Sequence, residues 1–132
     1  MPTGIETRLK ASRILLVEDN VLIGMLCTET LSEMGHAVCA IVATESDAVS
    51  AAAQHQPDLM IVDVSLDQGS GVSAIEKILR SGFVPHIFVS GDVSTVLVLR
   101  PDAIVLRKPY RNQELAHAIQ RALATSLGGS SV

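Results

Sequence analysis

The sequence predicts an α/β protein with a doubly wound, five-stranded parallel sheet. Short apolar runs rich in branched residues alternate with segments of helical periodicity, and the alternation occurs five times in 132 residues. Runs that are apolar throughout are typical of strands buried on both faces, and parallel strands need crossover connections between them. A chain of this length suits one domain with its own core. We therefore expect helices on both faces of one sheet.

The strand pattern occurs in five segments. RILLV at 13–17 and LMIV at 59–62 are continuous apolar runs, as expected for central strands. The other expected strands cover 36–42, 86–90 and 103–106.

Helical periodicity fills the intervals between these strands. The first helix is expected over 20–34, with Gly35 as its C-terminal stop. It places four apolar side chains on one face: Ile23, Cys27, Leu31 and Met34. The remaining helices are expected over 45–54, 72–81 and 111–126, with a short one over 92–100.

Composition narrows the class of protein. Apolar residues make up 48% of the chain and aromatic residues only 2%, which predicts an aliphatic core. The formal net charge is −4 with no basic block, which argues against direct DNA binding. Cys27 and Cys39 lack metal-site spacing, and no apolar run reaches transmembrane length. The first twelve residues contain no apolar segment of the kind found in a signal peptide. We expect a cytoplasmic protein with a flexible extension at 1–11, a domain at 12–126 and a disordered tail at 127–132.

Polar residues follow four of the five strands. Glu18 and Asp19 follow the first, Asp63 the third, Ser90 ends the fourth, and Lys108 follows the fifth. Binding sites in open α/β sheets lie at the carboxyl ends of the strands, so these side chains are expected to meet. Asp58 and Asp102 precede their strands and are expected at the opposite edge.

This set of residues suits phosphoryl chemistry. Three close carboxylates repel one another unless a cation neutralises them, and a hard divalent ion such as Mg²⁺ (or Mn²⁺) takes oxygen ligands. A carboxylate can attack phosphorus and form an acyl phosphate. A lysine and a hydroxyl would stabilise charge on the transferred group. Asp63, Lys108 and Ser90 supply one residue for each role.

Four motifs in the sequence resemble the receiver domain of two-component response regulators. ILLVEDN resembles the acidic-pair motif, PDLMIVDVSL the phospho-acceptor strand, IFVSG the Thr/Ser switch strand and LRKPY the lysine–proline motif. Gly71, eight residues after Asp63, matches the glycine that opens the family's third helix. The resemblance covers about residues 12–126 and implies a flavodoxin-like (βα)5 fold.

The resemblance implies a role for each matching residue. Asp63 would accept a phosphoryl group from a phosphohistidine, and Asp19 and Asp63 would bind Mg²⁺ with the backbone carbonyl of Ser65. Glu18 would act on the metal through water. The chain would be a single-domain regulatory protein, not an enzyme acting on a separate substrate.

Further roles follow from the last two motifs. Lys108 would pair with phosphoryl oxygens, its bond to Pro109 would be cis, and Ser90 would turn inward on phosphorylation. The phosphodonor would be a sensor histidine kinase or a histidine phosphotransferase. Output would pass to another protein through the face formed by 92–100, 103–106 and 111–126, and a homodimer is possible in this family.

Three positions depart from the family pattern. Val105 replaces the usual aromatic residue three positions before Lys108, so half of the usual switch pair is missing. Only 17 residues separate Ser90 from Lys108, which predicts a short or mobile fourth helix. Asp67 replaces the usual proline four residues after Asp63. PHIFVSGD and VLRKPY are similar to a bacterial subgroup of stand-alone receivers with a Phe-Ala-Thr-Gly type switch strand, which is associated with general stress signalling. We expect switching to run through ordering of residues 91–102.

Alternatives remain open at this level. Asp63 could be a turn residue, Glu18 could interact with a helix dipole, and the Ser90 hydroxyl could simply bond the backbone. The protein could act as a phosphate sink, as a phosphorelay intermediate, or as a pseudo-receiver that binds without phosphorylation. An Mg²⁺-dependent aspartyl phosphatase is disfavoured because Ser65 stands where such an enzyme needs a second aspartate. The nucleotide-binding patterns GxGxxG and GxxxxGK(S/T) do not occur in the sequence.

Overall fold

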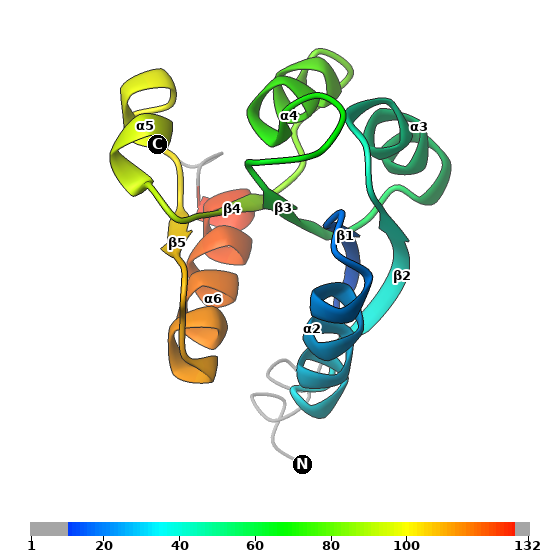
Figure 1. Cartoon of the computed structure of the whole chain (residues 1–132). Coiled ribbons are helices and arrows are strands. Elements are labelled where there is room, and N and C mark those ends of the chain that lie inside the picture. Colours follow the sequence, from blue (N-terminus) through cyan, green and yellow to red (C-terminus); the bar gives the residue numbers. More distant parts are fainter. Residues whose placement is uncertain (1–10, 129–132) are drawn as a thin grey trace.

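One parallel sheet organises the protein. The computed structural model describes residues 11–128. The strands lie in the order β2-β1-β3-β4-β5, as Figure 1 shows. Their bounds are β1 Arg13–Val17, β2 Ala37–Val42, β3 Leu59–Asp63, β4 His86–Ser90 and β5 Val105–Arg107. This order and the parallel pairing confirm the predicted doubly wound fold.

The strand register brings the carboxyl ends of the strands to one level. Val17, the last residue of β1, pairs with Val42 on one side and with Val62 on the other. Ser90, the last residue of β4, pairs with Arg107. The strand order reverses between β1 and β3, and a crevice forms at such a switch point.

Five helices cover the two faces of the sheet (Figure 1). The α2 helix (Val21–Glu33) and the α6 helix (Asn112–Gly128) lie on one face, where Leu16, Ile61 and Ile87 are buried. The α3 helix (Glu45–His55), the α4 helix (Gly71–Leu79) and the α5 helix (Val93–Leu99) cover the other face. Alternate side chains of each strand thus point to opposite faces of the sheet and contribute to two largely aliphatic cores.

Side-chain caps begin three of the helices. The side-chain oxygens of Asn20, Thr44 and Ser70 each accept a backbone N–H from the first turn of the following helix. Such caps satisfy N–H groups that have no partner inside a helix. Gly35 has a φ of +94°, the left-handed conformation expected of the residue that follows a helix.

The observed boundaries differ from the predicted ones in a few places. β5 starts two residues late, at Val105, and has only three residues, while α6 continues to Gly128 beyond the expected domain end at 126. The segment expected as a short helix does form α5, with seven residues. The flexible ends predicted for 1–11 and 127–132 fall mostly outside the described residues.

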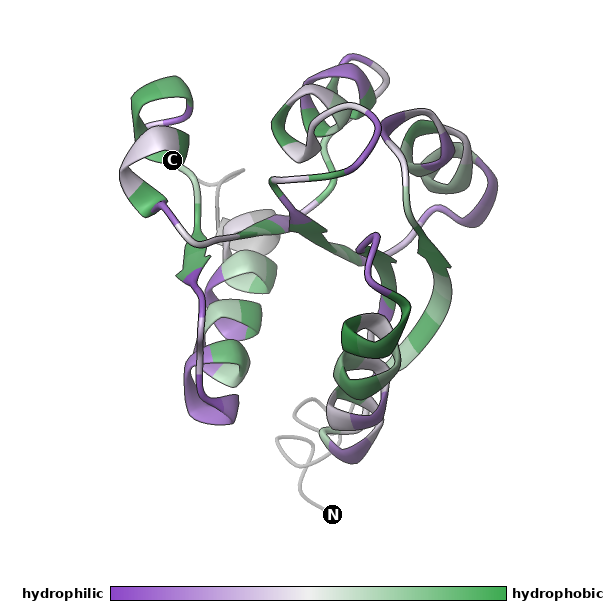
Figure 2. Cartoon of the chain, viewed as in Figure 1, coloured by the Kyte–Doolittle hydropathy of each residue, from purple (hydrophilic) through white to green (hydrophobic). Residues whose placement is uncertain are grey.

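Helix α2 is apolar on the side that faces away from the sheet. Its first two turns carry Val21, Leu22, Met25 and Leu26, all more than half exposed. Figure 2 shows these turns as strongly hydrophobic. Ile23 was predicted on the buried face and is instead 44% exposed, because Gly24 and Cys27 are the residues of this segment that pack inward. Within residues 11–128, no helix is long and apolar enough to cross a membrane.

Candidate functional site

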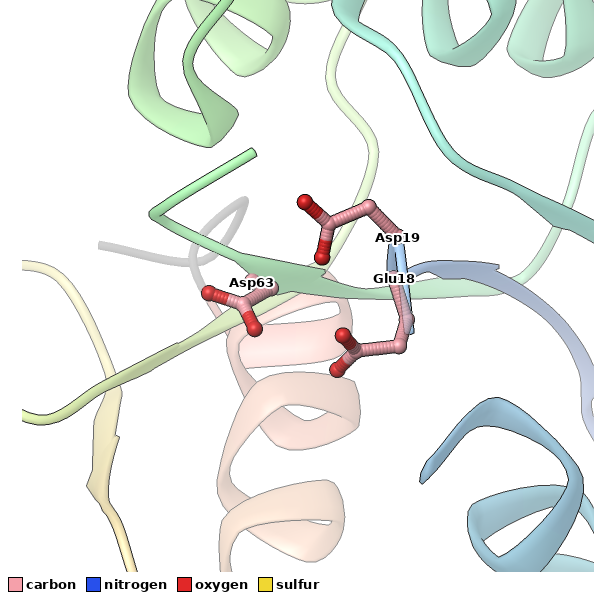
Figure 3. A group of neighbouring side chains, drawn as sticks. All are labelled: Glu18, Asp19 and Asp63. Carbon is pink, nitrogen blue, oxygen red and sulfur yellow. The ribbon is translucent and has the colours of Figure 1, made fainter. Parts of the chain in front are cut away.

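Three carboxylates converge at the crevice between β1 and β3. Glu18 and Asp19 directly follow β1, and Asp63 ends β3; Figure 3 shows the first two side chains directed toward Asp63. One oxygen of each lies within 4.8 Å of the others. Asp63 is 4% exposed and Glu18 is 9% exposed, whereas Asp19 is only partly buried, so the cluster is shielded from water on one side. The sequence prediction that these residues meet is therefore confirmed.

The structure gives the cluster one cationic neighbour. Lys108 Nζ lies 2.6 Å from Asp63 Oδ2, a distance typical of a charge-assisted hydrogen bond. Burial raises the pKa of Glu18, and the nearby Asp63 carboxylate raises it further, against the lowering effects of the Asn20 N–H and of Lys108. One lysine therefore leaves the negative charge of the three carboxylates only partly balanced.

The donor set fits a hard divalent cation. Carboxylate oxygens are the ligands that Mg²⁺ prefers, and two or three of them leave positions for water and a phosphoryl oxygen. Glu18 is held in place by the Asn20 N–H at 3.1 Å, and Asp63 Oδ1 accepts the Ser65 N–H at 2.9 Å. Glu18, Asp19 and Asp63 could therefore hold such an ion.

The loop between β3 and α4 is held at two points by acidic side chains. The Asp67 N–H donates to Asp19 Oδ2 at 2.7 Å, and the Ser70 N–H donates to Glu45 Oε1 at 2.9 Å. The other oxygen of Glu45 accepts the Ser73 hydroxyl at 2.6 Å and forms an ion pair with Lys77 at 2.7 Å. Glu45 thereby connects the start of α3 to both the loop and α4. The sequence analysis had not singled out Glu45.

Glu45 makes the stability of the protein depend on acid pH. Bonds from Lys77, from Ser73 and from the Ser70 N–H lower the pKa of Glu45 from its ordinary 4.5 to about 2. The folded state therefore favours the ionised form, and this stabilisation is complete above about pH 4.5 and is lost as the pH falls toward 2. We expect wild-type unfolding free energy, measured by urea denaturation at a series of pH values, to fall more steeply across this window than that of Glu45→Gln. Parallel curves would contradict the prediction.

Gly71 allows the first turn of α4 to approach the acceptor strand closely. A Cβ atom at this position would collide with the backbone carbonyl oxygen of Asp63 and would lie 2.7 Å from Val62 Cγ1. Backbone cannot move aside as a flexible side chain can. This explains why a glycine occurs eight residues after Asp63, as the resemblance implied.

Gly71→Ala should therefore destabilise the fold. We expect a loss of about 1–3 kcal/mol of unfolding free energy, the usual cost of overpacking a filled interior. Gly91→Ala is the matched control, because a Cβ there meets nothing within 4 Å. Urea unfolding should place the control within about 0.5 kcal/mol of wild type. Equal stabilities of the two variants would show that the contact at Gly71 is easily relieved.

Ser90 lies at the end of β4 but bonds to the backbone in this structure. Its hydroxyl donates to the Asp92 carbonyl and accepts the Asp92 N–H, both at 3.0 Å. Asp92 in turn accepts the hydroxyls of Ser94 and Thr95 at the start of α5. The Ser90 hydroxyl thus bonds the backbone, which is the alternative to a switch role that the sequence analysis left open.

An apolar cavity of about 620 Å³ adjoins the carboxylates. Leu16, Ile61 and Val89 contribute from the sheet, and α2 and the segment after β5 contribute most of the remaining lining: Ile23, Leu26, Cys27, Pro109 and Tyr110. The Tyr110 hydroxyl lies 3.9 Å from Cys27 Sγ, and burial raises the pKa of both groups. The Lys108–Pro109 bond is cis, as the resemblance implied.

The remaining aspartates lie away from the cluster. Asp58 is exposed and accepts the Arg13 N–H at the start of β1, which places it at the opposite edge of the sheet. Asp102 is also exposed, ahead of β5. The sequence prediction for both residues is confirmed.

The fold and the site define a class: a flavodoxin-like (βα)5 domain with an acidic cluster and a lysine at the carboxyl end of its sheet. The model of the response regulator receiver domain family matches residues 14–120. The chain belongs to this family.

Curated relatives and solved structures agree with this assignment. The phyllosphere-induced regulator PhyR of Methylorubrum extorquens is 32% identical over 117 residues, which are 86% of this chain and 44% of PhyR. The transcriptional regulatory protein PdtaR of Mycobacterium tuberculosis is 32% identical over 116 residues, 85% of this chain and 57% of PdtaR. The chain thus spans about half the length of these relatives.

Solved structures of PhyR share the fold. The response regulator PhyR from Brucella abortus superposes with a TM-score of 0.83 at 25% identity, over 97% of this chain and 54% of that one. The PhyR receiver domain of Erythrobacter litoralis gives 0.77 at 28% identity, over 88% of this chain and 92% of that domain.

Proposed function

We propose that this receiver domain carries a signal as an acyl phosphate on Asp63, received from a phosphohistidine. The observation that carries the proposal is the position of the Asp63 carboxylate. It is buried, 2.6 Å from Lys108 Nζ, and within 4.8 Å of the Glu18 and Asp19 oxygens. A candidate nucleophile, a cation and two further carboxylates are thus together at the carboxyl end of the sheet.

The proposed reaction transfers one phosphoryl group. An Asp63 oxygen attacks phosphorus, the bond between phosphorus and the donor imidazole breaks, and the imidazole leaves with the electron pair. A bound Mg²⁺ would neutralise charge on the phosphoryl oxygens. Lys108 would shift from Asp63 to a phosphoryl oxygen, and Ser90 would leave Asp92 to donate to another. The domain regulates in this way and does not act as an enzyme on a separate substrate.

The switch would reach a partner through α5, β5 and α6. Three apolar residues of α5 are exposed, Leu97, Val98 and Leu99. Ser90 is bonded to Asp92, which accepts both hydroxyls at the start of this helix. Movement of Ser90 would therefore loosen the start of α5. This route would not need the aromatic switch residue that Val105 replaces. A phosphoryl group on Asp63 that favours one of two conformations of the domain would shift the populations of the two conformations.

The partners would be proteins. The exposed apolar start of α2 borders the cavity beside Asp63 and suits a phosphodonor, either a sensor histidine kinase or a histidine phosphotransferase. A PhyR structure from Bartonella quintana is described as an anti-anti-sigma factor, which supports output through protein contact here as well. Both cysteines are free thiols, which suits a cytoplasmic location. A phosphate sink or relay intermediate would use the same site.

Intact mass spectrometry tests the proposal directly. Incubation with phosphoramidate and Mg²⁺ should add one phosphoryl group per chain, and chelation of the metal should prevent it. Folded protein that binds Mg²⁺ but gains no adduct would instead favour a phosphorylation-independent binding module. Turnover of a phosphate ester would favour an aspartyl phosphatase.

A further inference from the structure

The backbone N–H of Asp67 is placed to orient a metal-binding carboxylate. It donates to Asp19 Oδ2 at 2.7 Å, across 48 positions of sequence. Asp19 lies just past the end of β1 and is only partly buried, so packing alone does not fix its side chain. Among residues 11–128, the Asp67 N–H is the group that donates a hydrogen bond to the Asp19 carboxylate. The bond leaves Asp19 Oδ1 available to a cation.

The loop that supplies this N–H is itself fixed close to Asp63. Ser65 is bonded to Asp63 Oδ1 at one end, and Ser70 is bonded to Glu45 at the other. Gly69 has a φ of +90° and packs so closely on Glu45 that a side chain would collide with it. Asp67 lies between these anchors, so its amide has a defined position relative to the carboxylate cluster.

Position 67 can act in this way because it is not proline. Proline has no backbone N–H and could not donate to Asp19. The Asp67 side chain, by contrast, is exposed, and the hydrogen bond that joins this residue to Asp19 comes from its backbone N–H. The departure from the family pattern thus supplies a main-chain donor.

We propose that the Asp67 amide, and not its carboxylate, is a positioning group that holds Asp19 toward Asp63 for cation binding. The inference rests on the proposed function, since it assigns a residue to the metal site of that function. Groups that orient metal ligands commonly change metal affinity about 10–100-fold when removed.

Two substitutions at one position separate the amide from the side chain. Asp67→Ala and Asp67→Pro lose the same carboxylate, but only Asp67→Pro loses the N–H. Calorimetric titration with Mg²⁺ alone should give Asp67→Ala an affinity close to wild type and Asp67→Pro an affinity about 10-fold weaker. Equal affinities of the two variants, or tighter binding by Asp67→Pro, would overturn the proposal.

A second measurement avoids the conformational restriction that proline places on Leu66. In wild-type protein labelled with ¹⁵N and ¹³C, and without metal, a scalar coupling across the hydrogen bond should join the Asp67 amide nitrogen to the Asp19 carboxyl carbon. Protein that binds Mg²⁺ but shows no such coupling would overturn this inference alone. Protein that shows the coupling but binds no Mg²⁺ would overturn the proposed function, and with it the role assigned to the amide.

Discussion

Asp63→Asn is expected to abolish the phosphoryl adduct formed with phosphoramidate and Mg²⁺. The amide of asparagine is a poor nucleophile, while its size and shape match those of the carboxylate it replaces. Asp63 is buried and its Oδ1 accepts the Ser65 N–H, a bond that the asparagine carbonyl can retain. Loss of the adduct would then reflect the loss of the nucleophilic carboxylate and not a displacement of the loop that follows β3.

Asp58→Asn is the matched control for this variant. Asp58 belongs to the same stretch of sequence, but it lies at the opposite edge of the sheet, bonded to the Arg13 N–H. Intact mass should show one adduct for wild type and Asp58→Asn and none for Asp63→Asn. Wild-type adduct should also disappear on treatment with hydroxylamine, which attacks acyl phosphates. An adduct that persists in Asp63→Asn would place the acceptor elsewhere.

The main features of the site could be predicted from the sequence because strand ends are easily located. An apolar run in a parallel sheet ends where polar residues begin, and all five strands end at the same edge. Asp19, Asp63 and Lys108 could therefore be placed together although up to 89 positions of sequence separate them. The sheet topology, and not any local motif, determines their proximity.

Contacts made by the backbone could not be predicted in this way. Every residue except proline carries the same N–H, so no pattern shows that the amide of Asp67 bonds Asp19 or that the amide of Ser70 bonds Glu45. Sequence reasoning identified Asp67 as a departure from the family pattern. Its structural consequence depends on the path of the loop.

Helices with unusual burial were also difficult to predict. The first two turns of α2 are apolar on all sides, so periodicity does not determine which residues pack inward, and Ile23 was assigned to the wrong face. In α5 only Val96 is buried, and neighbouring Leu97, Val98 and Leu99 are exposed, so the apolar residues of this helix do not mark a buried face. Spacing of apolar residues along a helix does not distinguish those that are exposed from those that pack into the core.

Lys108→Met is expected to slow adduct formation by about 10²–10³-fold, the usual cost of removing a donor that stabilises charge developing in a transition state. Lys108 Nζ lies 2.6 Å from Asp63 Oδ2 and is the one cation paired with the carboxylate cluster among residues 11–128. Methionine preserves much of the length of the side chain. Without the ammonium group, three carboxylates would face the incoming phosphoryl oxygens, which are negatively charged as well.

Lys77→Met provides the control, because Lys77 also forms a short ion pair, at 2.7 Å, but with Glu45 and not with the acceptor. The rate of adduct formation should be measured by intact mass at saturating Mg²⁺, so that any change in metal affinity does not enter. We expect Lys77→Met to react at close to the wild-type rate. Equal rates for Lys108→Met and wild type would mean that the cation at the end of β5 holds the resting carboxylate in place but does not stabilise the transferred phosphoryl group.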